Sequence, residues 1–160
     1  MIRVGHGYDV HAFGGDKVLK LGGVEFIGHI GLLAHSDGDV LLHAVCDALL
    51  GAASLGDIGR HFPDTDATYK DADSSELLSK VSQLLLAKNY VVNNLDVTVI
   101  AQTPRMAAKI PEIEKRISSL LSIELEQVNV KATTTEKLGY IGRKEGIAVH
   151  CIALVHKGNS

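Results

Sequence analysis

The stretch Gly5-His6-Gly7-Tyr8-Asp9-Val10-His11 decides how the rest of this chain is interpreted. Its alternation suits a β-strand, in which every second side chain points to the same face, so Asp9 and His11 would lie side by side. A carboxylate beside an imidazole supplies two of the three protein ligands of a typical catalytic zinc site. The glycines would let another group approach the strand closely. A third ligand would have to come from another part of the chain.

The whole chain has the size and composition of a single α/β domain spanning residues 1–160. Hydrophobic residues make up 46% of it and aromatic residues only 4%, so we expect a core of Leu, Val, Ile and Ala. A formal net charge of −3 argues against a nucleic-acid partner. Cys46 and Cys151 form no C-x-x-C pair and are expected to be buried thiols. Without a signal pattern or a long apolar run, we predict a cytoplasmic protein that does not span a membrane.

Hydrophobic periodicity predicts an alternation of strands and helices. Strands are expected at 2–11, 95–101, 128–133 and 146–155, together with a hairpin at 18–26. Helices are expected from near Asp39 to about 53, from 74 to 88, and from 104 or 111 to 121. The nearly continuous apolar run at 146–155 is typical of a strand buried on both faces, either within a sheet or against another subunit.

His43 is the candidate third ligand. It lies on the helix predicted to begin near Asp39, where Ser36 and Asp39 resemble a capping box. Asp39, His43 and Asp47 would share one stripe of this helix. Such a stripe is usually only a solvated surface, and eight histidines will lie near some carboxylates by chance. With that alternative open, Asp9, His11 and His43 form a candidate site for Zn²⁺, or less selectively for Mn²⁺ or Fe²⁺.

Two further segments have the chemistry of a phosphate site. His35 and Ser36 would combine donor side chains with the free N–H groups of a helix start, although an ordinary serine cap is, for Ser36 taken alone, the better explanation. Residues 131–140 contain three threonines at a strand end, two lysines, and Glu136, which suits a hard cation such as Mg²⁺. The alternative for the threonines is simple β-propensity. A long loop at 56–66, rich in carboxylates, is also typical of a functional segment.

Five motifs occur together in a distinctive order along the whole chain. They are Gly5–His11, His35–Asp39 with His43, Gly56–Gly59, Phe62–Asp66 and Lys131–Gly139. This order closely resembles the 2-C-methyl-D-erythritol 2,4-cyclodiphosphate synthase family of the non-mevalonate isoprenoid pathway. The resemblance implies a ferredoxin-like α/β fold with helices on one side of a mixed four-stranded sheet. It also implies a homotrimer with active sites at the subunit interfaces.

The reaction implied by the resemblance is that of a phosphorus–oxygen lyase. The substrate would be 4-diphosphocytidyl-2-C-methyl-D-erythritol 2-phosphate. Its 2-phosphate would attack the β-phosphate within the same molecule, releasing CMP and leaving 2-C-methyl-D-erythritol 2,4-cyclodiphosphate. Two other functions remain open from the residues alone. One is a zinc-dependent phosphoesterase that uses a metal-bound water, and the other is a trimeric nucleotide-binding regulator without catalytic activity.

The resemblance further implies roles for individual residues. Asp9, His11 and His43 would bind Zn²⁺ or another divalent transition metal, and Glu136 would bind Mg²⁺ or Mn²⁺ with the diphosphate. His35 and Thr134 would be catalytic. Substrate-binding positions would be Asp9, His11, His35, Ser36, Asp47, Asp57, Ile58, Gly59, Phe62, Pro63, Asp64, Thr65, Asp66, Ala101, Gln102, Thr103, Pro104, Arg105, Met106, Thr133, Thr134, Thr135, Glu136, Tyr140 and Arg143.

The subunit arrangement would divide these residues between neighbouring chains. Residues 101–106 and 133–136 would reach the cytidine and diphosphate from the adjacent subunit. An isoprenoid diphosphate would occupy a central apolar cavity with Arg143 as its partner. Tyr140, Arg105 and His150 depart from the phenylalanine, lysine and acidic residues found at these places in members of the family. The change at His150 bears on the lining of that cavity.

Overall fold

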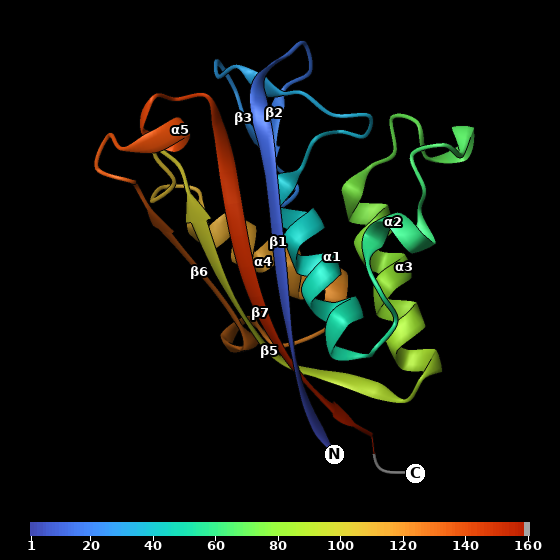
Figure 1. The fold of residues 1–160 in the computed structure, drawn as a ribbon. Helices are drawn as coiled ribbons and strands as arrows, with labels where there is room; N and C mark the ends of the chain where they lie inside the picture. The colour runs from blue at the N-terminus through green and yellow to red at the C-terminus, as the bar shows by residue number, and fades with distance from the viewer. Residues whose placement is uncertain (159–160) are drawn as a thin grey trace.

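The computed structural model describes residues 1–158 and contains a mixed five-stranded sheet in the order β4-β1-β7-β5-β6 (Figure 1). The strands are β1 (Ile2–Gly15), β4 (Gly31–Leu32), β5 (Tyr90–Ile100), β6 (Val128–Thr133) and β7 (Gly146–Lys157). Strand β7 pairs antiparallel with both β1 and β5, and β6 runs parallel to β5. The four predicted strands are thus confirmed, and the two-residue β4 extends the sheet at its β1 edge.

Helices cover one face of this sheet, which confirms the predicted ferredoxin-like α/β architecture. They are α1 (Val40–Ala52), α3 (Ser74–Ala87) and α4 (Ile110–Leu121), with the short helices α2 (Ile58–His61) and α5 (Gly139–Gly142) and 3₁₀ turns at Ala67–Tyr69 and Leu125–Gln127. The predicted hairpin is present as β2 (Leu19–Leu21) and β3 (Val24–Phe26). Both cysteines are buried and free. Within residues 1–158, no helix combines the length and apolar character needed to cross a membrane.

Helix α1 is buried on nearly all sides, although its sequence suggested one solvated stripe. Ten of its 13 residues are buried, including Leu42 and Leu50, which lie outside the expected inner face. The polar side of α1 is covered because α2 and α3 pack beside it. His43 and Asp47 are therefore only partly exposed and lie beneath other elements. The alternative that this stripe is an ordinary solvated surface is wrong.

The start of α1 is fixed by Asp39, which corrects the predicted Ser36 capping box. Asp39 is the N-cap, and its fully buried carboxylate accepts the N–H of Leu42 at 3.0 Å. It also accepts the N–H groups of Gly22 and Gly23 at 2.9 and 2.7 Å. Three N–H donors offset much of the cost of burying this carboxylate. Asp39 consequently joins the β2–β3 hairpin to the helix that carries His43.

Glycines in β1 bring α1 directly onto the strand. A Cβ on Gly5 would lie 1.9 Å from the carbonyl oxygen of Ala48, and one on Gly7 would lie 1.9 Å from that of Ala44. No side chain fits at either position without moving the helix backbone. The group that approaches this strand is therefore α1 itself. This contact places Asp9, two residues further along the strand, beside His43.

The other face of the sheet carries exposed apolar side chains. They alternate along β1, and β7 contributes Ile152; the exposed residues are Ile2, Val4, Tyr8, Val10 and Ile152. Strand β7 lies mid-sheet between β1 and β5, as its apolar sequence predicted. Its side chains on the helical face are buried, whereas its side chains on this second face are only partly covered. An apolar sheet face of this kind is typical of a surface that packs against a partner.

Candidate metal centre

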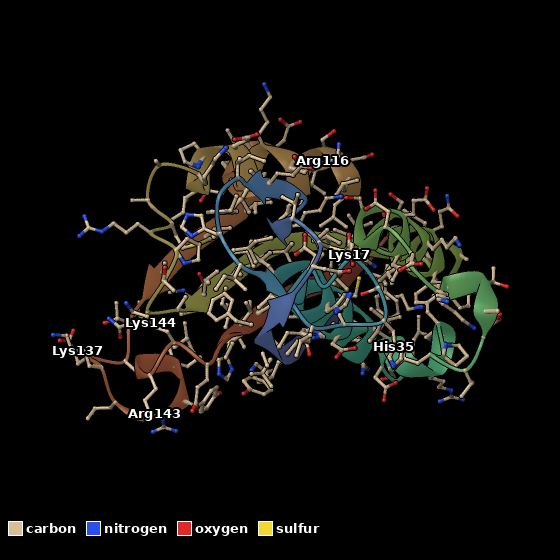
Figure 2. The ribbon with its side chains drawn as sticks, turned by 90° about the horizontal axis from the view of Figure 1, so that it is seen from above. Lys17, His35, Arg116, Lys137, Arg143 and Lys144 are labelled. Carbon is tan, nitrogen blue, oxygen red and sulfur yellow. The ribbon has the colours of Figure 1, made fainter. Side chains whose placement is uncertain are left out.

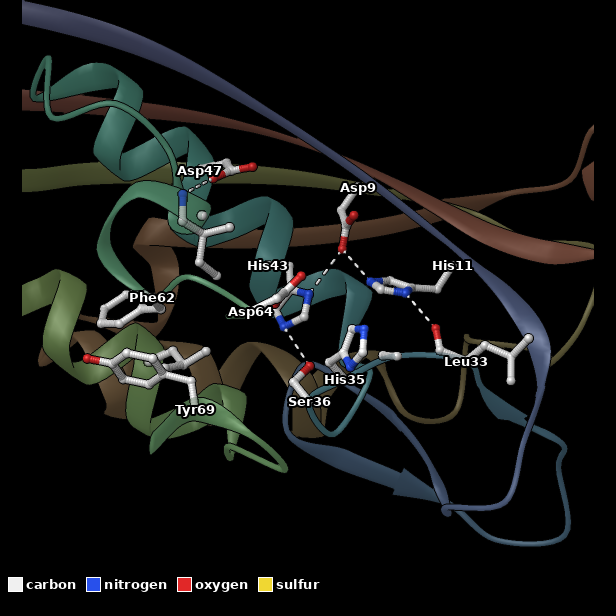
Figure 3. A pocket seen from close by; sticks show the side chains of 14 residues that line it. Asp9, His11, Leu33, His35, Ser36, His43, Asp47, Phe62, Asp64 and Tyr69 are labelled. Carbon is white, nitrogen blue, oxygen red and sulfur yellow. Dashed lines mark hydrogen bonds and ion pairs between the residues drawn. The ribbon is translucent and has the colours of Figure 1, made fainter. Parts of the chain in front are cut away.

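Asp9, His11 and His43 converge where β1 crosses the first turns of α1 (Figure 3). The Oδ2 atom of Asp9 lies 2.9 Å from Nε2 of His11 and 3.1 Å from Nδ1 of His43. One ligand atom from each residue lies within 4.8 Å of the other two. The structure thus brings together the three residues that the sequence proposed as ligands.

The atoms that face one another in this centre suit a divalent transition metal. Nδ1 of His11 lies 2.9 Å from the carbonyl oxygen of Leu33, which can only accept, so Nδ1 carries a proton. The remaining nitrogen, Nε2, faces the carboxylate of Asp9 at 2.9 Å and can hold either a proton or, in the neutral ring, a metal. One carboxylate with two imidazoles is a donor set that Zn²⁺ accepts in place of such a proton.

Interactions within the triad shift the pKa values of Asp9 and His11. Burial alone would raise the pKa of Asp9, but hydrogen bonds with His11 and His43 lower it to about 2. The hydrogen bond to Asp9 raises the pKa of His11, against the opposing effect of burial. Asp9 is consequently ionised at neutral pH, and His11 holds a proton more firmly than a free histidine does.

Metal affinity should therefore fall as the pH is lowered. A metal can bind Nε2 of His11 only after the proton there has left, so binding releases this proton. Because the pKa of His11 is raised, the loss of affinity should begin above the ordinary histidine value of 6.5 and steepen below it. Titration with Zn²⁺ against a competing chelator between about pH 5 and about pH 9 measures this dependence. Constant affinity throughout that range would contradict the coupling.

The triad forms one wall of a cavity of about 380 Å³. The lining contains the predicted site residues Asp9, His11, His35, Ser36, His43, Asp47, Ile58, Gly59, Phe62 and Asp64. It also contains Leu33, Ala34, Tyr69 and Leu77, which the sequence did not single out. These four have no reactive group in a recognisable spacing, so nothing in the sequence distinguishes them from core residues. The aromatic ring of Tyr69, packed against Phe62 at 5.3 Å, widens the apolar part of the wall.

The segment at 56–66, predicted as a loop, contains the short helix α2 and is held against α1 by a partly buried hydrogen bond. Oδ1 of Asp47 accepts the N–H of Ile58 at 2.8 Å, and burial raises the pKa of the Asp47 carboxyl. Asp57 caps α2 by accepting the N–H of Arg60 at 2.9 Å. Asp57, Pro63, Thr65 and Asp66 lie outside the cavity lining given above. The predicted substrate loop thus contributes some side chains to the cavity and uses others to maintain its own shape.

The remaining predicted substrate residues lie at one end of the sheet, from the carboxyl ends of β5 and β6 to α5. Because β5 and β6 are parallel, their carboxyl ends adjoin, and the N–H of Ala101 donates to the carbonyl of Thr133 at 3.0 Å. Oε1 of Gln102 accepts the N–H of Lys137 at 3.2 Å. Figure 2 shows Lys137 and the nearby Arg143 on the far side of the molecule from His35. A single chain therefore carries two separate groups of predicted substrate residues.

Interactions within this second group hold its polar side chains near one another. The Thr134 hydroxyl accepts the N–H of Glu136 at 3.2 Å and lies 3.4 Å from the Glu136 carboxylate. The Tyr140 hydroxyl lies 3.1 Å from that of Tyr8 on the apolar sheet face. Arg143 pairs with Glu145 at 3.1 Å. Hydroxyl, carboxylate and guanidinium groups thus lie exposed at one end of the sheet.

Known proteins match almost the entire chain. A family model described as the YgbB family matches residues 2–156. The chain belongs to the YgbB family. The 2-C-methyl-D-erythritol 2,4-cyclodiphosphate synthase of Ectopseudomonas mendocina (strain ymp) is 61% identical over 156 residues, which cover 98% of this chain and 99% of that relative.

Solved structures of YgbB relatives have the same fold. The bifunctional IspDF from Campylobacter jejuni gives a TM-score of 0.96 at 45% identity over 99% of this chain, which spans 43% of that longer protein. The IspF of Plasmodium falciparum, in a CDP complex, gives a TM-score of 0.86 at 39% identity over 99% of this chain and 97% of that one. Membership of the YgbB family confirms the resemblance inferred from the sequence, and with it the predicted cyclodiphosphate synthase function in isoprenoid biosynthesis.

Proposed function

We propose that the chain converts 4-diphosphocytidyl-2-C-methyl-D-erythritol 2-phosphate to 2-C-methyl-D-erythritol 2,4-cyclodiphosphate and CMP. The metal ligands, the cavity residues and the second group of residues would each have a distinct role in this reaction. The observation that carries this proposal is the convergence of Asp9, His11 and His43 on a cavity that also exposes His35 and Ser36. The relative from Plasmodium falciparum was solved with CDP, which has the cytidine diphosphate portion of this substrate.

Asp9, His11 and His43 would hold Zn²⁺ or another divalent transition metal, and Glu136 would hold Mg²⁺ or Mn²⁺. Bound there, the two ions would neutralise charge on the reacting phosphate groups. His35 and Ser36 line the same wall and would donate hydrogen bonds to the 2-phosphate. The Thr134 hydroxyl would support the oxygens of the β-phosphate during transfer.

Positioning would supply much of the rate enhancement. The nucleophile and the electrophile belong to one substrate, and alignment of such groups can be worth about 7–11 kcal/mol. Asp47, Asp57 and the loop residues Ile58, Gly59 and 62–66 would surround the methylerythritol portion. Phosphoryl transfer mainly requires orientation and charge neutralisation, so no covalent intermediate with the protein is needed.

Three copies of the chain would assemble the complete site. The metal centre lies near the β1 side of the sheet, whereas residues 101–106 and 133–136 lie at the β6 edge. In a ring of three, the β6 edge of one copy would face the β1 edge of the next, so that residues 101–106, 133–136 and Tyr140 reach the cytidine and diphosphate. The apolar faces of the sheets would then enclose a central cavity, where Arg143 would bind an isoprenoid diphosphate.

Phosphorus NMR of the purified protein with substrate, Zn²⁺ and Mg²⁺ tests the reaction. We expect the signals of a cyclic diphosphate and of CMP to appear together as the substrate signals disappear. Inorganic phosphate or a linear product would instead support a zinc-dependent phosphoesterase. Unchanged substrate after prolonged incubation, with a cytidine nucleotide bound, would support a nucleotide-binding regulator. Either of these results would overturn the proposal.

A further inference from the structure

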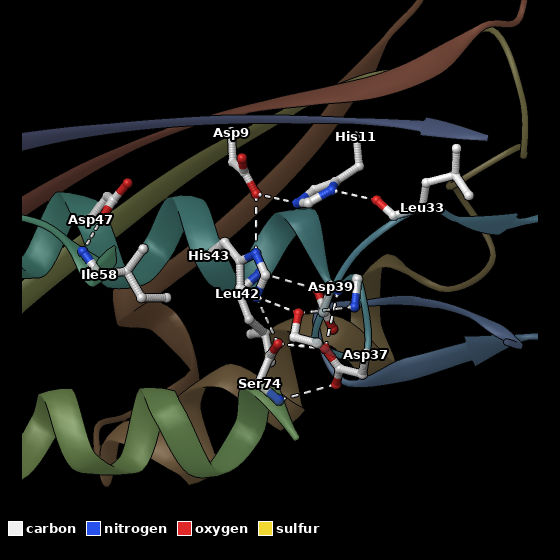
Figure 4. A network of polar contacts seen from close by, with 12 residues as sticks. Asp9, His11, Leu33, Asp37, Asp39, Leu42, His43, Asp47, Ile58 and Ser74 are labelled. Atoms are coloured by element: carbon white, nitrogen blue, oxygen red, sulfur yellow. Dashed lines mark hydrogen bonds and ion pairs between the residues drawn. The ribbon is translucent and has the colours of Figure 1, made fainter. Parts of the chain in front are cut away.

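A chain of hydrogen bonds runs from His43 away from the metal centre into the protein (Figure 4). Nε2 of His43 lies 2.9 Å from the hydroxyl of Ser74, the first residue of α3. The Ser74 hydroxyl lies 2.5 Å from Oδ1 of Asp37. We propose that Ser74 and Asp37 are positioning residues that fix which nitrogen of His43 is presented to the metal. This inference rests on the proposed metal site.

The direction of these hydrogen bonds follows from the donors available. A carboxylate only accepts, and Asp37 takes the one proton of the Ser74 hydroxyl on Oδ1 and the N–H of Ser74 on Oδ2 at 3.0 Å. The Ser74 oxygen must then act as an acceptor toward His43, so Nε2 of His43 carries a proton. In the neutral ring the other nitrogen, Nδ1, which lies 3.1 Å from Asp9, then has the free lone pair. The tautomer required for metal binding is thereby set.

Ser74 is the decisive partner because of its distance and burial. Ser36 also approaches Nε2 of His43, but at 3.4 Å, and its hydroxyl accepts the N–H of Gly38 at 3.2 Å. The shorter contact is with Ser74, whose side chain is fully buried. Water therefore cannot reach this position to take over the role of the Ser74 hydroxyl. Removing it would leave a partly buried N–H of His43 with only the more distant Ser36 hydroxyl as an acceptor, and the ring would be free to change tautomer or orientation.

Asp37 also ties the metal centre to the proposed phosphate-binding segment. The N–H of Asp37 donates to the carbonyl of Ala72 at 3.2 Å, and the N–H of Asp71 donates to the carbonyl of His35 at 3.0 Å. These bonds hold residues 35–37 against the segment that leads into α3. Asp37 thus orients His43 through its carboxylate and Ser74, while its backbone N–H helps to hold the segment beside His35 and Ser36 in place.

The affinity for Zn²⁺ in a Ser74→Ala variant tests this inference. Loss of such a supporting hydrogen bond typically weakens metal binding about 10–100-fold, and we expect a loss of this size in competition with a chromophoric chelator. The visible spectrum of the Co²⁺-loaded variant should also change, because the spectrum reports ligand geometry. Ser79→Ala is the matched control: Ser79 lies on the same helix and its hydroxyl donates only to the carbonyl of Ser75, at 3.0 Å. Its affinity and spectrum should match the unmodified protein.

Asp37→Asn provides a second test if Ser74→Ala fails to fold. Asparagine keeps the shape of Asp37 but weakens the acceptor for the Ser74 hydroxyl, so a smaller loss of Zn²⁺ affinity is expected. If both variants bind Zn²⁺ as the unmodified protein does while His43→Ala does not, the positioning role is overturned and the metal site stands. If His43→Ala also binds Zn²⁺ normally, the metal site itself is wrong.

Discussion

A His43→Ala variant is expected to lose bound Zn²⁺ and about 10³-fold in kcat/KM while keeping its fold. The metal contributes several kcal/mol of charge stabilisation in such sites, and two remaining ligands hold Zn²⁺ poorly. Alanine is a good helix former, so α1 should remain intact. Metal analysis of the purified protein and steady-state kinetics measure the two losses. His29→Ala, which removes an exposed histidine outside the cavity lining, should change neither. Full activity of His43→Ala would contradict the proposed mechanism.

Mixing experiments separate the metal centre from the second group of residues. His43→Ala and Glu136→Ala should each be inactive alone, because each lacks one half of the proposed site. When the two variants are co-expressed, each mixed ring would contain an interface at which both halves are intact. A partial recovery of activity is therefore expected. If mixed assemblies form but stay inactive, the proposed division of the site between neighbouring copies is contradicted.

A Gly7→Ala variant is expected to be strongly destabilised. The added Cβ would lie 1.9 Å from the carbonyl oxygen of Ala44 and 2.7 Å from the backbone nitrogen of Ala48. Both are helix backbone atoms, so the methyl group can be accommodated only by moving α1 away from β1. We expect a loss of about 3 kcal/mol in the free energy of unfolding, measured by denaturant titration. The same displacement would widen the metal centre, so Zn²⁺ affinity should fall as well.

Gly51→Ala is the matched control for this effect. Gly51 lies within α1, and apart from its chain neighbours and the adjoining backbone of its own helix, no described atom lies within 4 Å of the position of an added Cβ. Replacing a glycine in such a position should stabilise the helix by about 0.5–1 kcal/mol. A Gly7→Ala variant as stable as Gly51→Ala would show that α1 and β1 do not pack as closely as described.

The sequence alone predicted those site residues whose spacing along a strand or helix places their functional groups on one face. The Asp9-x-His11 pair follows from strand alternation, and His43 follows from helical periodicity after Asp39. Ser74 was missed because Asp73-Ser74-Ser75-Glu76 has the pattern of an ordinary helix start, which it also is. The carbonyl of Leu33, which fixes the tautomer of His11, is a backbone group without a sequence signature. Only tertiary packing gives these atoms their partners.

The burial of α1 could not be predicted for a related reason. A helix whose polar stripe contains His43 and Asp47 looks amphipathic, and only the packing of α2 and α3 shows that this stripe faces other elements. The separation of the second group of residues from the cavity is likewise a property of sheet order. Strands β1 and β6 are separated by β7 and β5, an order that neither strand's own sequence predicts.

The alternation of glycines with larger residues in β1 has a further consequence for strand register. Gly5 and Gly7 face α1, whereas the intervening His6 and Tyr8 face the apolar side. A slip of one residue would turn His6 and Tyr8 toward the helix backbone, where even a methyl group does not fit. Such a slip would also turn Asp9 and His11 away from His43. The misregistered strand is therefore excluded by sterics, and the chain cannot form its core without also assembling its metal ligands.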